Sequence, residues 1–476
     1  MSPLVWLRVL IALFLLLPFL VLIWKLEQVG LPPGREIAAA LWFTVQQASL
    51  SALLSIAFGA LGALGLLKAG RARKVFESAF LIPNLFPTLF VLLACLKVFS
   101  PFPFGLAGIV LVHVAINTGL AAVAIARLLE DKVGGWAELA LVEGANRRLF
   151  LPVAARYLAR DLGLLFLFIF SVCFSSLTVP MVAGRFDGLT LEMLIYEKIK
   201  ISGQWDQALG LAFLQTALIF GFSFLLSADR TLRSPSRRNL ALLASRWGLV
   251  IPLVFSAIVV LSQLEGLAEG LRQAPVLKSE LPRAAFGTLA VGGGVGLLSF
   301  LLLTLIAVSM PHRRFQKFLI GYVAPSSVLT GFALLLIELP LPPQGQMILG
   351  ITLIQLPLFY RLYVDGTLES IQPQLKVAQT LGAGPWLTFR QIVFPQVAPA
   401  LAAASGLAAF WACGEFALSS LLAGQNLTLA LMVKSLLSSY RLEAATLLLW
   451  LLLGFGVSLW IIFWSVGYVL GAKSRT

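Results

Sequence analysis

Glu415 is the side chain best suited to do chemistry in this sequence, because it lies in a long apolar stretch directly after Cys413-Gly414. A carboxylate placed in lipid costs several kcal/mol of free energy and is therefore a functional candidate by default. If this carboxylate faced a central pathway, it could help a cationic solute to pass through. The alternative is a glutamate that is paired with a lysine or arginine, or neutralised by burial, and serves structure alone. Both interpretations stay open at this stage.

Three further polar residues within apolar stretches are candidates for a translocation path. His113 and Asn117 are four residues apart, so they share one face of a helix. They either line a pathway or form hydrogen bonds between helices. Gln355 takes the place of His113 in the second half of the chain, which favours a shared structural role.

The residue patterns of catalysis and of nucleotide or metal binding are missing from the sequence. The string most like a Walker A loop, from Gly467 to Ser474, has the wrong spacing and no strand before it. The three cysteines, Cys95, Cys173 and Cys413, are far apart and lie in apolar runs, which is typical of small buried side chains. We therefore expect no catalytic residue, no metal site and no cofactor bound by this chain.

The elements that hold these residues are set by an unusual composition. Hydrophobic residues make up 59% of the 476 and charged residues 12%, whereas a soluble domain is about half apolar and about a quarter charged. The net charge of +14 could suggest nucleic acid. However, the basic residues form short clusters between apolar runs rather than one face, so no nucleic-acid partner is expected.

Apolar stretches of about 20 residues, the length that crosses a bilayer as a helix, occur twelve times. The sequence therefore predicts an all-α integral membrane protein. The twelve predicted spans are 4–24, 41–67, 79–99, 105–126, 161–182, 205–227, 247–264, 284–309, 319–339, 345–364, 398–422 and 442–470.

The connecting segments predict the orientation of these spans. Clusters of lysine and arginine follow the second, fourth, sixth and eighth spans, and Lys473 and Arg475 lie at the end of the chain. The positive-inside rule places these segments, and both termini, in the cytoplasm. The first apolar stretch lacks a small-residue cleavage site, which favours a retained helix over a cleaved signal peptide.

The chain repeats itself at an offset of 238 residues. Ala140 and Gly144-Ala145 match Ala378 and Gly382-Ala383, and Thr190-Leu191 matches Thr428-Leu429. The repeat predicts two halves of six spans each and equal orientation, residues 1–240 and 241–476, joined by a polar, basic segment near 228–246. Each half has one long connecting segment, which we call the first loop (127–160) and the second loop (365–397).

Within the second loop, the stretch from Lys376 to Pro395 resembles the EAA loop of bacterial ABC importer permeases. The pattern of that loop is Glu-Ala-Ala, three residues, glycine, about nine residues and then Ile-x-x-Pro. The resemblance implies the fold of type I ABC importer permeases and a loop that couples to an ATPase. The residues that carry it are Ala378, Gly382, Ala383 and Pro395 together with Lys376, and in the first loop Glu138, Ala140, Gly144, Ala145 and Pro152.

Each half departs from that pattern in its own way. Lys376 stands where the family has glutamate, and Gly144 to Pro152 is about five residues shorter than Gly382 to Pro395. We therefore expect unequal contacts of the two loops with an ATPase. The plain alternative is a pair of basic loops beside the membrane, although repetition at the same place in both halves argues against it.

The resemblance to ABC permeases also implies partners and a substrate class. The chain itself would lie in the bacterial inner membrane. Its partners would be a dimer of a separate ATPase subunit, which would bind ATP and Mg²⁺, and a periplasmic substrate-binding protein. Several stretches, among them Gln47 to Ser55, Phe104 to Asn117 and Thr190 to Tyr196, are similar to the fused permeases of thiamine importers and of their ferric-iron relatives. The expected solute is thus thiamine or a similar cation, with ferric iron as the alternative.

Two alternatives of other kinds concern mechanism and the outer face. An ion-coupled secondary transporter would need charged groups at mid-membrane in both halves, and a serine, Ser175, stands in the first half where the second has Glu415. The polar segments Gly184 to Asp206 and Gln425 to Arg441 predict either a platform for a binding protein or amphipathic helices at the membrane interface.

Overall fold

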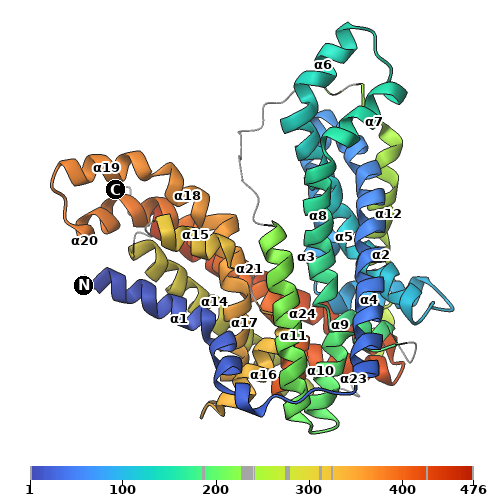
Figure 1. The fold of residues 1–476 in the computed structure, drawn as a ribbon, viewed down its shortest axis with the longest axis vertical. Helices are drawn as coiled ribbons and strands as arrows, with labels where there is room; N and C mark the ends of the chain where they lie inside the picture. The colour runs from blue at the N-terminus through green and yellow to red at the C-terminus, as the bar shows by residue number, and fades with distance from the viewer. Residues whose placement is uncertain are drawn as a thin grey trace. The chain divides into compact units, whose positions relative to one another are not determined.

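The computed structural model describes residues 3–184, 188–226, 240, 242–273, 279–309, 313–322, 325–424 and 427–473. Within these ranges the regular structure is helical throughout, with no strand, as Figure 1 shows. The predicted all-α class is therefore confirmed. Most of the predicted joint at 228–246, and the start of the outer segment at Gln425, fall outside the described residues.

The chain forms two compact units. Unit 1 comprises Met1–Leu31, Ile195–Thr216 and Glu269–Thr476, and unit 2 comprises Pro32–Leu194 and Ala217–Ala268. The helices α10 (Leu191–Lys200) and α11 (Trp205–Leu226) have residues in both units, and α13 (Leu267–Gln273) lies at a boundary.

Unit 2 is built around three long helices, α2 (Gly34–Leu66), α5 (Leu106–Leu128) and α8 (Ala159–Phe174). Its other elements are η2 (Gly70–Ala72), α3 (Arg73–Leu85), α4 (Thr88–Val98), the π-helical turn η3 (Leu129–Val133), α6 (Gly134–Val142), α7 (Arg147–Tyr157), α9 (Thr178–Ala183), η4 (Arg246–Leu249) and α12 (Val250–Glu265).

Unit 1 has the corresponding long helices α14 (Leu281–Val308), α17 (Pro343–Phe359) and α21 (Phe394–Cys413), together with α24 (Leu442–Lys473). Its other elements are α1 (Pro3–Trp24), η1 (Leu26–Gln28), α15 (Arg313–Gly321), α16 (Ser327–Ile337), η6 (Tyr360–Val364), α18 (Asp365–Ser370), α19 (Gln372–Thr380), α20 (Pro385–Thr388), η7 (Phe389–Val393), α22 (Ala417–Leu422) and α23 (Leu429–Ser438).

The compact units do not coincide with the two sequence halves, because each takes in the first helix of the other half. In unit 1, α1 packs against α14 and α16, and the hydroxyl of Tyr322 donates a hydrogen bond to the carbonyl of Leu15 at 2.6 Å. In unit 2, α12 packs against α3 and α4, and the hydroxyl of Ser256 donates to the carbonyl of Ala79 at 2.7 Å. The sequence halves thus describe the repeat rather than the compact bodies.

Eight helices in the described residues are long and apolar enough to cross a membrane, and ten if each of two bent pairs forms one span. The twelve predicted spans are consistent with this number. The predicted span 79–99 is broken, since α3 and α4 meet at 93°. Phe86 precedes Pro87 and has an extended backbone (ψ 151°), because a residue before proline is disfavoured in the helical conformation.

The repeat seen in the sequence is also a repeat of hydrogen bonds. In unit 2 the hydroxyl of Thr44 in α2 accepts the backbone N–H of Leu191 at 2.8 Å. In unit 1 the hydroxyl of Thr288 in α14 accepts the N–H of Leu429 at 2.9 Å. The chain therefore folds the same way around these two contacts, and α10 corresponds to α23 residue by residue.

Candidate functional site

The second loop contains a tightly capped helix end at the residues that the sequence singles out. The N–H of Ala383 donates to the carbonyl of Ala378 at 3.0 Å, and the N–H of Gly382 donates to the carbonyl of Gln379 at 3.1 Å. These two bonds form a Schellman motif, with Gly382 in the left-handed conformation at φ 74°. Ala378 is buried, whereas Lys376 is exposed at the surface of α19.

The first loop ends its helix with the same motif at the same offset. The N–H of Ala145 donates to the carbonyl of Ala140 at 2.8 Å, and the N–H of Gly144 donates to the carbonyl of Leu141 at 3.2 Å. Gly144 has a φ of 73°. An added Cβ would meet nothing within 4 Å at Gly144 or at Gly382, so the backbone conformation, rather than crowding, requires glycine.

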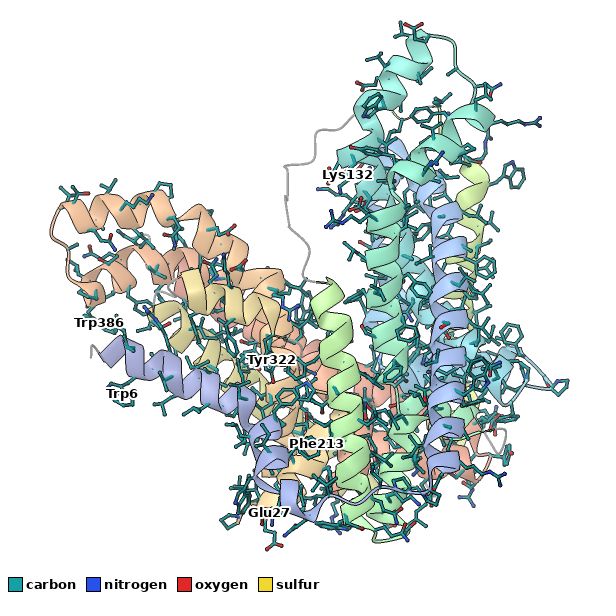
Figure 2. All side chains as sticks on the ribbon, in the orientation of Figure 1. Trp6, Glu27, Lys132, Phe213, Tyr322 and Trp386 are labelled. Atoms are coloured by element: carbon teal, nitrogen blue, oxygen red, sulfur yellow. The ribbon has the colours of Figure 1, made fainter. Side chains whose placement is uncertain are left out.

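Each capped turn presents large apolar side chains to the outside. Val142, two residues before Gly144, is 85% exposed in the first loop, and Leu381, one residue before Gly382, is 80% exposed in the second. Other exposed apolar residues are Trp136, Leu139, Leu149 and Val153 in the first loop and Val377, Trp386 and Leu387 in the second. Figure 2 shows Trp386 at the tip that α19 and α20 form. Such patches mark surfaces that bind a protein or a membrane.

The loops lie at one end of each unit. In unit 2, α6 and α7 lie at one end and α9 lies at the other (Figure 1). In unit 1, α19 and α20 lie at one end and α16 lies at the other (Figure 1). In each unit the capped turn thus lies beyond the end of the long helices.

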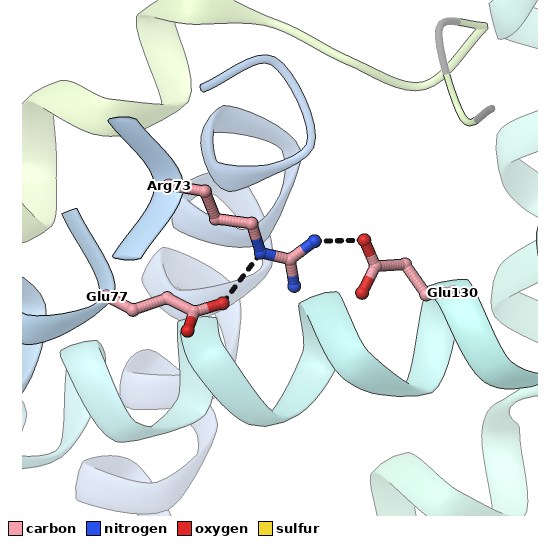
Figure 3. Close-up of polar contacts among 3 residues, drawn as sticks. All are labelled: Arg73, Glu77 and Glu130. Carbon is pink, nitrogen blue, oxygen red and sulfur yellow. Dashed lines mark hydrogen bonds and ion pairs between the residues drawn. The ribbon is translucent and has the colours of Figure 1, made fainter. Parts of the chain in front are cut away.

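Ion pairs hold the base of the first loop. Arg73, at the start of α3, binds Glu77 at 2.7 Å and also Glu130 in η3, as Figure 3 shows. Lys132 of η3 binds Asp161 at the start of α8 at 2.6 Å. Together these contacts connect the beginning of the loop to the helices on either side of it.

At the base of the second loop, side-chain amides take the place of the basic side chains of the first. The side-chain amide of Gln316 in α15 donates to the carboxylate of Asp365 in α18 at 2.8 Å. Gln396 in α21 donates to Gln374 in α19. The first loop is therefore tied to α3 by a salt bridge, and the second loop is tied to α15 by a side-chain amide.

The chain leaves the two turns by different routes. After Gly144, the side chain of Asn146 caps α7 by accepting the N–H of Leu149 at 3.0 Å, and Pro152 lies inside that helix. The helix then bends by 65° between Tyr157 and Ala159. After Gly382 the helical path from Pro385 to Cys413 forms one apolar span, with Pro395 in the first turn of α21. The first loop thus ends in a bend that the second lacks.

Glu415 lies at the break between α21 and α22. Its carboxylate accepts the N–H of Leu418 at 3.0 Å, and it forms further hydrogen bonds with the N–H of Ala417 and the hydroxyl of Ser327 in α16. The side chain thus caps α22 and ties the break to a neighbouring helix. The role of Glu415 in a translocation path stays a prediction.

His113 and Asn117 belong to a buried polar cluster that joins α2, α5 and α8. The amide of Asn117 donates to the sulfur of Cys173 at 3.7 Å, and the hydroxyl of Ser51 lies 3.4 Å from Nδ1 of His113. The amide of Gln47 donates to the carbonyl of Cys173 at 2.9 Å. This cluster therefore supplies hydrogen bonds between the helices α2, α5 and α8. Nε2 of His113 has no hydrogen-bond partner within the described part of the chain.

The second half has a different set of residues at these positions. The offset of 238 relates Asn117, rather than His113, to Gln355, and it relates His113 to Ile351. Gln47 follows Thr44 by three residues, and Val291 follows Thr288 by three residues. Two polar positions of unit 2, those of Gln47 and His113, are thus apolar in unit 1, whereas Asn117 has a polar counterpart. The complete polar cluster is therefore not required for the architecture.

Sequence reasoning missed Thr44 and Thr288. Each follows an exposed aromatic residue by two positions, Trp42 (68% exposed) and Phe286 (73% exposed). An aromatic residue two positions before a threonine, in the second span of each half, is the sequence pattern that could have identified them. The threonine hydroxyl accepts the N–H of the leucine in the repeated Thr-Leu segment.

Comparison with known proteins gives one family and two relatives. Residues 225–472 match the family described as binding-protein-dependent transport system inner membrane component. The chain is 28% identical over 388 residues to the thiamine transport system permease protein ThiP of Escherichia coli (strain K12), covering 74% of this chain and 72% of that protein. It is 26% identical over 389 residues to ThiP of Salmonella typhimurium (strain LT2), with the same coverage. No solved structure matches the chain significantly.

Proposed function

The chain belongs to the family of binding-protein-dependent transport system inner membrane components, and we propose that it is the permease subunit through which thiamine or a similar organic cation is imported. It is a multi-pass membrane protein and an ABC importer permease. The observation that carries the proposal is the same capped turn at the same offset in both halves, with a large apolar side chain exposed within two residues of each glycine.

We infer that each turn docks one copy of a separate ATPase subunit in the cytoplasm. A Schellman cap fixes the direction in which the chain leaves the helix, so a force applied to the turn is passed to the long helix behind it. Trp136 and Val142 in the first loop, and Leu381 and Trp386 in the second, supply the apolar area. ATP and Mg²⁺ would be bound by the ATPase, and a periplasmic binding protein would deliver the solute.

The substrate class rests on the similarity to ThiP and on polar groups inside the helices. Glu415, His113, Asn117 and Gln355 are the residues that we place along the path. A carboxylate at the break between α21 and α22 is suited to a cation because it adds charge where the chain is not continuously helical.

Uptake of radiolabelled thiamine tests the proposed function. The chain is reconstituted in proteoliposomes with a partner ATPase and a thiamine-binding protein, oriented so that the binding protein can dock from outside. We expect ATP-dependent accumulation that unlabelled thiamine suppresses. Accumulation of radiolabelled ferric iron instead would favour the iron alternative. Uptake that follows an ion gradient without ATP would favour a secondary transporter.

Glu415→Gln tests the part of this carboxylate. Glutamine keeps an oxygen that can accept the N–H of Leu418, so the cap and the amount of folded protein should be preserved. We expect thiamine uptake to fall about tenfold, comparable to the loss of one charge-assisted hydrogen bond of about 1.5 kcal/mol. Unchanged uptake would assign Glu415 to the cap alone.

A further inference from the structure

The helix α7 in the first loop covers one of its faces within unit 2 and leaves a second apolar face exposed. Ala154 and Leu158 are buried in the core of the unit. Leu149, Val153 and Tyr157 are spaced by four residues, so they share one face of the helix, which we call the apolar stripe. All three are more than half exposed. The stripe is therefore an apolar surface that the described part of the chain leaves uncovered.

Basic side chains accompany this stripe without any acidic neighbour in the sequence. The segment 147–160 contains no aspartate or glutamate. Arg148, Arg156 and Arg160 are exposed, and none of them forms an ion pair with an acidic residue in the described ranges. Arg156 directly precedes Tyr157 and lies at the border of the stripe. The exposed surface of α7 thus combines apolar area with positive charge.

The core that α7 joins places this helix at the level of the membrane surface. Ala154 and Leu158 belong to the same buried cluster as Leu66, the last residue of α2, and Leu249 of η4 packs against that cluster. Trp247 of η4 is 79% exposed. Exposed tryptophan is typical of the boundary between headgroups and hydrocarbon. In unit 2, α7 therefore lies where the long helix α2 leaves the membrane (Figure 1).

The direction of α7 also suits a helix that lies on a membrane. It meets α8 at a bend of 65°. Because spanning helices are tilted by about 20° from the membrane normal on average, this bend brings α7 nearer to the membrane plane than to the normal. A helix in this orientation can bury an apolar face below the headgroups while its arginines extend to the phosphate groups.

The second loop lacks this combination. Counted from Pro395 as the first loop is counted from Pro152, the positions of the three arginines hold Gln391, Pro399 and Ala403. The chain there continues from Pro385 to Cys413 as one apolar span instead of bending after a short helix. The basic apolar surface is therefore a property of the first half alone and is not required by the repeat.

We propose that α7 is an interfacial helix that binds anionic phospholipids, with its apolar stripe among the acyl chains and its arginines on the phosphate groups. The leaflet is the one beside the first loop, which the positive-inside rule makes cytoplasmic. This contact anchors the first loop at a fixed depth and leaves the turn at Gly144 in water. The inference goes beyond the proposed function, since it assigns a lipid to a surface that is separate from the ATPase-docking turns.

Quenching by lipids tests this proposal on the full chain alone in nanodiscs. Single cysteines replace Val153 on the stripe, Ala155 on the opposite face of α7 and Val142 near the capped turn, and each is labelled with an environment-sensitive fluorophore. The native cysteines are buried, and the wild-type chain gives the background of labelling. The quencher is a nitroxide close to the headgroup of phosphatidylcholine. We expect several-fold stronger quenching at Val153→Cys than at Ala155→Cys or Val142→Cys.

The charge of the lipid is varied in the same assay. Quenching at Val153→Cys should rise when phosphatidylglycerol is added to the phosphatidylcholine discs. Adding Arg148→Gln and Arg156→Gln should remove this rise, because each basic side chain near an anionic surface favours contact by about fivefold, the equivalent of about 1 kcal/mol. Arg390→Gln, which removes an arginine of the second loop, is the matched control and should leave the rise unchanged.

Three outcomes would overturn the proposal. They are equal quenching at Val153→Cys and Ala155→Cys, quenching that does not respond to phosphatidylglycerol, and fluorescence at Val153→Cys that changes only when the ATPase is added, which would make α7 a protein-docking surface. Leu149→Cys repeats the test on the same stripe if Val153→Cys is not monodisperse. Because the assay needs neither thiamine nor ATP, its result is independent of the uptake that tests the proposed function.

Discussion

The first and second loops share one local structure and differ in everything attached to it. Both end a helix in a Schellman motif with glycine at φ 73° or 74°. The base of the first is held by the salt bridges of Arg73 and Lys132, and that of the second by the amides of Gln316 and Gln396. The capped turn has thus been retained in both halves while its attachments diverged, as expected if the turn itself is what a partner contacts.

The largest effect should come from alanine at the two left-handed glycines. A side chain in that conformation costs about 1 to 2 kcal/mol, which shifts the population of the capped turn by a factor of about 5 to 30. We expect Gly382→Ala to reduce ATP-dependent thiamine uptake by about that factor. Gly144→Ala should cost the same stability but less uptake, because the path after the first turn is already bent at Leu158.

Matched controls exist for both variants. Gly384 lies two residues beyond Gly382 with φ −66°, and Gly163 lies in α8, and an added Cβ would meet nothing within 4 Å at either. Gly384→Ala and Gly163→Ala should leave uptake unchanged. Equal losses for Gly144→Ala and Gly382→Ala would contradict the expected inequality of the two loops.

The next effect should be equal in the two halves. Thr44→Val and Thr288→Val each remove the hydroxyl that accepts a buried N–H, that of Leu191 or Leu429. An unsatisfied buried donor costs about 1 to 3 kcal/mol. We expect both variants to lower the midpoint of thermal unfolding in detergent by similar amounts. A shift for only one of them would show that the repeat of hydrogen bonds is not maintained in solution.

The smallest effect should distinguish the loop base held by salt bridges from the loop base held by side-chain amides. Glu130→Gln removes a partly exposed ion pair with Arg73, whose worth is about 1 kcal/mol or less and falls as salt screens the charges. Its unfolding midpoint should drop at low salt and approach that of the wild type at about 1 M salt. Asp365→Asn in the second loop keeps an acceptor for Gln316 and should show little dependence on salt. The reverse pattern would argue against the two kinds of base.

Local features were predictable from the sequence, and long-range contacts were not. Gly144 and Gly382 could be found because a helix cap depends on a few adjacent residues that recur at a fixed offset. The partners of Thr44 and Thr288 are 147 and 141 residues away, so no local pattern specifies them. The packing of α1 in unit 1 and of α12 in unit 2 likewise depends on tertiary contacts between apolar faces, which all such helices present.

Two further differences have local causes. The break in the predicted span 79–99 follows from Pro87, which prevents Phe86 from being helical, and hydropathy alone does not detect it. Glu415 was recognised as unusual from its apolar surroundings, but its capping of α22 required the position of the helix break.

Binding-protein-dependent ATP hydrolysis is the most direct test of the assignment as an ABC importer permease with two docking turns. The chain and its ATPase are reconstituted in nanodiscs, and hydrolysis is measured with and without the thiamine-loaded binding protein. The expected result is a several-fold stimulation that Gly382→Ala suppresses and Gly384→Ala does not. Hydrolysis that is unaffected by the binding protein, or suppressed equally by both substitutions, would contradict the account.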